Sequence, residues 1–264
     1  GIGNAVIGCL LSWLVLAKRT RAMTHKLGSR TMPEFFGSRY NDNGMKIFCA
    51  LIIFVFLTPY AASVYMGLSY LFSAVFPAVD YIWWMVIMAV LTALYLSLGG
   101  YVATVLTDFV QGIIMIIGIV FVVYFVLSSD VVDGLKNGLQ SLSQIPKDGS
   151  NLTSPFGGQN WFNLLSLLVL TSLGTWGLPQ MVHKFYTIKD NKSIKQAAVI
   201  STLFALLIGG SAYFIGAFAR LFLGNQVPAE GFGAVMPLML NKALPAVMMG
   251  VLLVLILSAS MSTL

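Results

Sequence analysis

One carboxylate interrupts a long apolar stretch of the sequence. Asp108 is the only Asp, Glu, Lys or Arg between Val102 and Leu127, a stretch long enough to cross a bilayer. A charge at membrane depth is costly, and such carboxylates often ligate a cation, relay a proton or line an ion path. Asp108 lies about seven residues, or ~10 Å, from one end of the stretch. The same group could instead cap or pair with a neighbouring helix near the interface.

Hydroxyl side chains gather at the end of the last apolar stretch, which reads LSASMSTL. They belong to Ser258, Ser260, Ser262 and Thr263. Small polar residues can simply allow helices to pack closely. Hydroxyls and free carbonyls are also the oxygen ligands that a hard cation prefers, and they let the ion leave again. The tail is therefore a candidate sodium site, with close packing as the alternative.

Gly and Pro interrupt the apolar segment 161–180. Its second half reads TSLGTWGLPQ and holds Gly174, Gly177 and Pro179. Such interruptions are a sequence sign of a broken membrane helix whose freed backbone groups bind ions or solutes. The alternative is a helix that ends at Pro179, because proline removes a donor and clashes with the preceding turn.

Composition and pattern indicate what holds these residues in place. Of 264 residues, 58% are hydrophobic and 9% charged, whereas soluble domains have about a quarter charged. We therefore predict an all-α integral membrane protein, a multi-helix bundle forming one transmembrane domain over residues 1–264. The predicted spans are 1–17, 47–76, 81–98, 102–127, 161–180, 197–219 and 246–264. The chain begins and ends inside apolar runs, so we expect it to be part of a longer protein.

The basic residues predict the orientation. The loops 18–46 and 181–196 hold eleven of the fifteen Lys and Arg residues, and seven crossings place both loops on one side. The positive-inside rule makes that side cytoplasmic, in a multi-pass protein of the plasma membrane. The net charge of +6 does not indicate nucleic-acid binding, because the basic residues lie between apolar runs. The motifs HExxH, GxSxG, P-loop and CxxC are missing from the sequence, so we do not expect an enzyme.

Four stretches together resemble the sodium:solute symporter family. They are RTMPEFFGSRY (30–40), LYLSLGGYVATVLTDFVQG (94–112), GLPQMVHKFYTIKDNKS (177–193) and SASMSTL (258–264). The resemblance implies a LeuT-like fold of two inverted repeats, here incomplete and covering core helices two to eight. It also implies that segment 161–180 is the sixth core helix, which is broken.

The same resemblance implies roles for particular residues. The carbonyl of Ala259 and the hydroxyls of Ser262 and Thr263 match sodium ligands of the family. Asp108 matches a carboxylate linked to sodium release or to a second sodium ion. Tyr60, which follows Pro59 in mid-span, is a substrate candidate, although a mid-membrane tyrosine often has only a hydrogen-bond partner. Further substrate candidates on the broken helix are Ser172, Thr175 and Trp176.

The implied activity is sodium-coupled secondary active symport by alternating access. The partners would be Na⁺, a small carboxylate or amino-acid-like solute and the lipid bilayer, with no cofactor and no metal other than Na⁺. The stretch after Gly177 looks most like that of members carrying pantothenate, monocarboxylates or proline, but Gln180 stands where several relatives have His. The alternatives are a proton-coupled carrier that uses Asp108, and a membrane sensor with a transporter-like fold.

Overall fold

The computed structural model describes residues 3–147, 150, 151, 153, 161–224, 226–229 and 231–263. Within these ranges, the side chains at 96, 99–105, 146, 147, 150, 151, 262 and 263 are outside the description. Helices make up most of the described chain, which confirms the predicted all-helical membrane class.

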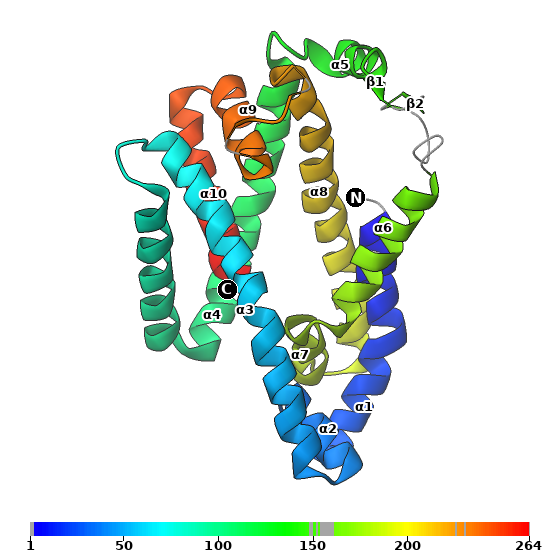
Figure 1. The fold of residues 1–264 in the computed structure, drawn as a ribbon. Helices are drawn as coiled ribbons and strands as arrows, with labels where there is room; N and C mark the ends of the chain where they lie inside the picture. Colours follow the sequence, from blue (N-terminus) through cyan, green and yellow to red (C-terminus); the bar gives the residue numbers. More distant parts are fainter. Residues whose placement is uncertain are drawn as a thin grey trace. The chain divides into compact units, whose positions relative to one another are not determined.

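The first helical run covers residues 3–27 without a break. It contains two stretches of wider, π-type turns, η1 (Asn4–Leu10) and η2 (Trp13–Ala17), and then α1 (Lys18–Leu27). The remaining elements are α2 (Met32–Tyr40), α3 (Asn43–Val75), α4 (Tyr81–Ser128), α5 (Gly134–Ser143), β1 (Pro146–Lys147), β2 (Ser150–Asn151), α6 (Trp161–Gly174), η4 (Thr175–Gly177), α7 (Pro179–Thr187), α8 (Asn191–Phe222), η5 (Phe232–Ala234), α9 (Val235–Ala243) and α10 (Ala246–Thr263) (Figure 1). The two short strands pair antiparallel.

Several described helices are long and apolar enough to cross a membrane. They are α3, α8 and the part of α4 from Leu106 to Ser128, and the bent pair formed by α6–η4 and α7 makes a fourth candidate. Shorter apolar helices cover Tyr81–Tyr95 and Ala246–Met261. Each predicted span overlaps helical backbone in the part of the chain that the structure describes, and its crossing of a membrane stays a prediction.

The predicted spans 81–98 and 102–127 lie on one continuous helix. The backbone stays helical through Gly99 and Gly100, and α4 is one element of 48 residues. At ~1.5 Å per residue it would measure about 72 Å if straight, more than twice the ~30 Å hydrocarbon layer. In Figure 1 its teal part descends and its green part ascends. The element therefore contains two apolar parts joined by a helical bend. We call them the first limb (Tyr81–Tyr95) and the second limb (Leu106–Ser128) of α4.

The chain divides into two compact units that alternate along the sequence. Unit 1 contains residues 1–59 and 160–210, and unit 2 contains residues 60–159 and 211–264. The core of unit 1 consists of Trp13, Ala17, Phe185, Ile194 and Ala198. The core of unit 2 is larger and includes Val126, Val132, Ile215, Phe218, Met239 and Leu253. The broken helix lies in unit 1, whereas Asp108, Tyr60 and α10 lie in unit 2.

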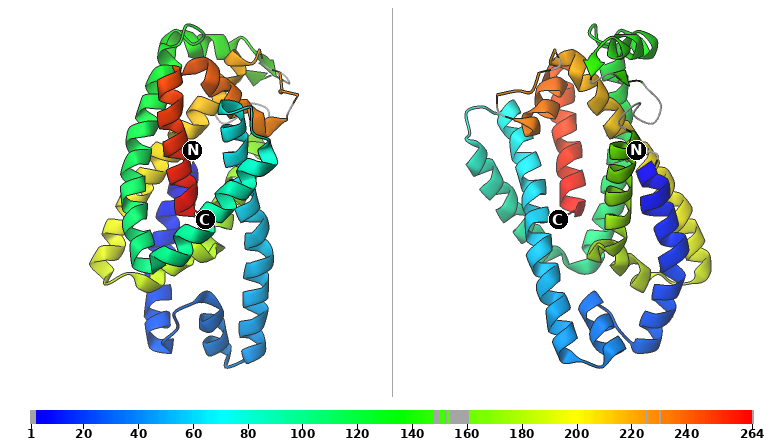
Figure 2. Two further views of the ribbon diagram at one scale, coloured as in Figure 1. Left: turned by 90° about the vertical axis from the view of Figure 1, so that its left-hand side faces the viewer. Right: turned by 45° about the vertical axis from the view of Figure 1, so that its right-hand side comes forward.

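Within unit 2, α10 packs along α4 (Figure 2). The two helices approach closely at Gly118, where an added Cβ would lie 1.5 Å from Leu255 Cδ1 and 2.8 Å from Leu255 Cγ. Leu255 is only 8% exposed, so it has little room to move aside. The absence of a side chain at Gly118 therefore sets how deeply α10 sits on α4.

Replacing Gly118 by alanine is expected to lower the free energy of unfolding by ~1–3 kcal/mol, because the new methyl group overpacks this contact. Unfolding of the purified protein in detergent measures the loss. Gly67→Ala is the matched control, since a Cβ there would meet nothing within 4 Å. Adding Leu255→Ala to Gly118→Ala should restore part of the loss, and wild-type stability of Gly118→Ala alone would contradict this packing.

Candidate functional site

A bend of 48° interrupts the helix that begins at Trp161. The helix tightens over Thr175–Gly177, Leu178 is extended with φ −62° and ψ 128°, and α7 then starts at Pro179. Proline suits the first position of a helix because its missing N–H would have had no partner there. The helix therefore stops at Leu178 and a second helix follows at once, which fits the interpretation of TSLGTWGLPQ as a helix that breaks and resumes. Such a break leaves backbone groups available to a ligand.

Three predicted substrate residues lie just before the break, and their polar groups have partners within unit 1. Ser172 is fully buried, and its hydroxyl donates to Asn4 Oδ1 at 3.1 Å. The hydroxyl of Thr175 donates to the Ser172 carbonyl at 2.7 Å. The indole N–H of Trp176 donates to the Ile7 carbonyl at 2.8 Å. Their contact with a solute stays a prediction, and the structure gives each of them a role in holding the helix.

Tyr60 follows Pro59 inside α3 and belongs to unit 2. Its side chain is 37% exposed, and its carbonyl accepts a hydrogen bond from the Ser63 hydroxyl at 2.7 Å. The structure thus brings together Ser172, Thr175 and Trp176, while Tyr60 stands in the other unit.

Asn4 was not among the predicted site residues. Its side-chain amide donates to Thr171 Oγ1 at 3.2 Å while its carbonyl oxygen accepts from Ser172. One amide therefore connects η1 to two residues of α6. The available signal was a single amide inside the apolar run GIGNAVIG, because a polar group at that depth needs a partner.

Asp108 lies half-buried on the second limb of α4. One turn further along, Gln111 is only 7% exposed, and its Oε1 has no hydrogen-bond partner among the described residues. A buried acceptor without a donor calls for an explanation, and an ion or water is one. The limb therefore carries a carboxylate and a buried amide oxygen one turn apart.

The hydroxyl-rich tail stays helical through Thr263. Ala259 is half-buried, whereas the side chains of Ser262 and Thr263 lie outside the described part. Because α10 packs along α4, the tail belongs to the same unit as Asp108. The sodium ligands Ala259, Ser262 and Thr263 stay a prediction. Among the described residues, no group of three or more His, Cys, Asp and Glu side chains could hold a metal ion.

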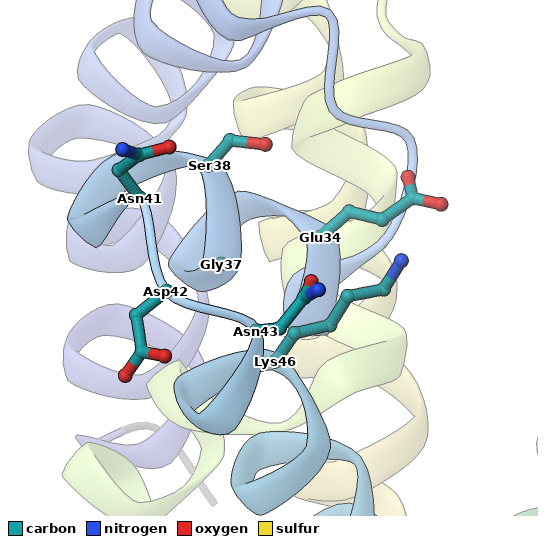
Figure 3. A pocket seen from close by; sticks show the side chains of 7 residues that line it. All are labelled: Glu34, Gly37, Ser38, Asn41, Asp42, Asn43 and Lys46. Atoms are coloured by element: carbon teal, nitrogen blue, oxygen red, sulfur yellow. The ribbon is translucent and has the colours of Figure 1, made fainter.

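A polar hollow of about 320 Å³ lies at the turn between α2 and α3 (Figure 3). The carboxylate of Glu34 accepts the N–H groups of Arg30 and Thr31, and the first of these bonds is the main cause of its lowered pKa. The carboxylate of Asp42 accepts the N–H groups of Gly44 and Met45. Figure 3 shows the two carboxylates on opposite sides of the hollow. These acids stabilise helix starts and do not converge on a common ligand.

Comparison with known proteins identifies the family. The sodium:solute symporter family matches residues 3–264. The chain is 32% identical over 213 residues to sodium/proline symporter 2 of Staphylococcus saprophyticus, covering 77% of this chain and 40% of that protein. It is 31% identical over 194 residues to the sodium/proline symporter of Staphylococcus aureus, covering 72% of this chain and 36% of that protein. No solved structure matches.

The chain spans about two fifths of the length of these curated relatives. The family match includes the bend at Leu178, the limb with Asp108 and the tail of α10. This chain belongs to the sodium:solute symporter family.

Proposed function

We propose that the protein carrying this chain is a symporter that uses the sodium gradient to import a small organic solute. The observation that supports this most strongly is the family match over residues 3–264. The helix broken at Leu178 adds physical support, because binding sites of secondary transporters are typically built on interrupted helices.

In this proposal, α10 and the second limb of α4 serve the ion. The Ala259 carbonyl and the hydroxyls of Ser262 and Thr263 coordinate Na⁺, together with groups outside this chain. Asp108 then offers the departing ion a carboxylate on its way to the cytoplasm. With the loops 18–46 and 181–196 cytoplasmic, inward movement of Na⁺ gains ~2.3 kcal/mol per 100 mV of inside-negative potential.

Coupling between ion and solute follows from linkage. If Na⁺ stabilises the outward-open state, it raises the affinity for a solute that binds the same state, and the solute raises sodium affinity by the same factor. Closure of the outer side and opening of the inner side then releases both ligands. The substrate predictions Tyr60, Ser172, Thr175 and Trp176 would line or support the solute pocket.

Proline is the first solute to test, because the similar relatives are named sodium/proline symporters. Pantothenate and small monocarboxylates follow from the resemblance of the stretch after Gly177. In proteoliposomes holding the complete protein, we expect one of these labelled solutes to accumulate with an inward sodium gradient. Replacing sodium by choline should abolish the accumulation.

A test that does not need the solute is thermal unfolding of the purified protein. A ligand that binds only the folded state raises Tm as its concentration exceeds its Kd. We expect Na⁺ to raise Tm and choline at equal ionic strength to leave it unchanged. Equal Tm in both salts would contradict a sodium site.

The single carboxylate at Asp108 supports one second candidate, a proton-coupled carrier of the same family. Its signature would be solute accumulation in choline that increases as the external pH falls. Accumulation that requires sodium at both of two pH values would reject it.

A further inference from the structure

We infer that the helical run 3–27 braces the broken helix on both sides of its bend, so that α6 and α7 keep a fixed angle while the protein changes state. We call this run the bracing helix. The inference concerns how the break is held and stands apart from the proposed ion and solute. All of its contacts lie within unit 1.

The N-terminal end of the bracing helix holds α6 and η4. Asn4 bonds to Thr171 and Ser172, and the Ile7 carbonyl accepts the indole N–H of Trp176. A Cβ added at Gly8 would lie 3.3 Å from Thr175 Oγ1 and 3.5 Å from Ser172 Cα. The two helices therefore touch closely over the turns that lead into the break.

The other end of the bracing helix holds α7. Trp13 and Phe185 pack edge to face with ring centroids 4.9 Å apart, and they are 4% and 0% exposed. One turn beyond Ala17, the Arg21 guanidinium donates through Nε to the Ile188 carbonyl at 2.9 Å and through Nη2 to the Lys189 carbonyl.

Arg21 suits this position chemically. Ile188 and Lys189 directly follow the last residue of α7, and a cation near the C-terminal end of a helix interacts favourably with the helix dipole. The planar guanidinium can donate to two carbonyls at once, which a lysine ammonium does less well. Arg21 therefore fixes the chain directly after the end of α7.

These two sets of contacts restrict motion at Leu178. Because 3–27 is one continuous helical run, rotating α7 against α6 would break either the contacts of Asn4 and Ile7 or those of Trp13 and Arg21. The broken helix should move as one body with the bracing helix. Asn4 and Arg21 are thus positioning residues, which act on a ligand only through the geometry of the break.

The test measures the distance across the bend by pulsed electron paramagnetic resonance. Spin labels are placed on Leu170 in α6, which is 72% exposed, and on Lys184 in α7, which is also exposed. The complete protein, with Cys9→Ser and Cys49→Ser, is studied in lipid nanodiscs in choline chloride, in sodium chloride, and in sodium chloride with proline. We expect one narrow distance distribution that is the same in all three.

Variants test whether the named contacts set this distance. Asn4→Ala combined with Arg21→Gln should broaden the distribution between positions 170 and 184, and Arg21→Lys should give an intermediate width. Arg19→Gln is the matched control, because it removes an equal charge from an exposed position of the same helix. A second label pair, on Leu170 and on Leu139 in the other unit, reports whether the conditions change the state of the protein.

Two results would overturn the inference. The first concerns the protein without the test substitutions. If the distance between positions 170 and 184 changes under the same conditions that change the distance between positions 170 and 139, Leu178 is a hinge. A narrow, unchanged distribution in the double variant would show that Asn4 and Arg21 do not hold the bend. Neither result depends on sodium coupling, because the sodium effect on Tm tests that separately.

Discussion

Replacing Ser262 by alanine in the complete transporter is expected to raise the sodium concentration for half-maximal uptake by roughly 10- to 100-fold. A hydrogen-bonding or coordinating contact to a charged group contributes ~1.5–3 kcal/mol, and each 1.4 kcal/mol changes affinity about tenfold. Thr263→Ala is expected to have an effect of the same size. The measurement is initial solute uptake as a function of sodium concentration at constant ionic strength.

Ser260 offers the matched control for Ser262. It has the same side chain on the same helix, but it lies two residues earlier and therefore ~200° away around the axis. Ser260→Ala should keep the sodium affinity of the unsubstituted protein. Unchanged sodium affinity in both Ser262→Ala and Thr263→Ala would remove the hydroxyl tail from the ion site.

The position of the interruption near Leu178 could be predicted because its cause is local. Gly174, Gly177 and Pro179 act within one or two turns of their own helix, and proline cannot continue the hydrogen-bond ladder. The sequence alone did not decide between a break and an end, because that depends on what stabilises the residues after Pro179. In the structure, the core around Phe185 and the guanidinium of Arg21 hold α7 in place.

The sequence pattern predicted two separate spans, 81–98 and 102–127, and did not predict that the backbone stays helical through Gly99 and Gly100. Glycine lowers helix propensity by only ~1 kcal/mol relative to alanine, and unpaired backbone groups in a membrane cost several times more. Continuing the helical hydrogen bonds is therefore favoured over opening a loop there. The pattern of apolar residues indicated two apolar stretches but not the helical connection between them.

The contacts that support the candidate site are distant in sequence. Asn4 is 168 residues from Ser172, and the close approach of Gly118 to Leu255 joins two different helices. Neither pair has a local signal beyond one unusual residue, an amide in one case and a glycine in the other. The sequence thus located candidate ligands by residue type, whereas the structure was needed to find the residues that position them.

These supporting contacts indicate a different role for each unit: unit 1 holds the broken helix, and unit 2 holds the predicted ion ligands. In unit 1, the bracing helix fixes the two halves of the broken helix, which favours motion as a rigid body. In unit 2, Gly118 seats α10 against the helix that carries Asp108, so the predicted ion ligands and the carboxylate share one packed pair of helices. A substitution at Gly118 should therefore disturb sodium affinity as well as stability.

Asp108→Asn should separate ion release from ion binding. The substitution keeps the size of the side chain and removes its charge, whose attraction to a nearby cation is a few kcal/mol at an effective dielectric of about 20. If Asp108 draws Na⁺ out of its site toward the cytoplasm, net uptake should fall by about tenfold or more. Exchange of internal for external solute, with sodium on both sides, should continue, because it does not require the empty carrier to return.

The comparison of the two transport modes decides the role of Asp108. Asp108→Glu is the control, because it retains the charge one methylene further out and should retain most net uptake. An equal loss of net uptake and exchange in Asp108→Asn, with weaker sodium affinity, would make Asp108 an ion ligand, with the buried Gln111 oxygen as its natural neighbour. Unchanged transport in both modes would leave Asp108 with a structural role only, because a carboxylate on the ion path cannot be neutralised without changing the rate at which the ion leaves.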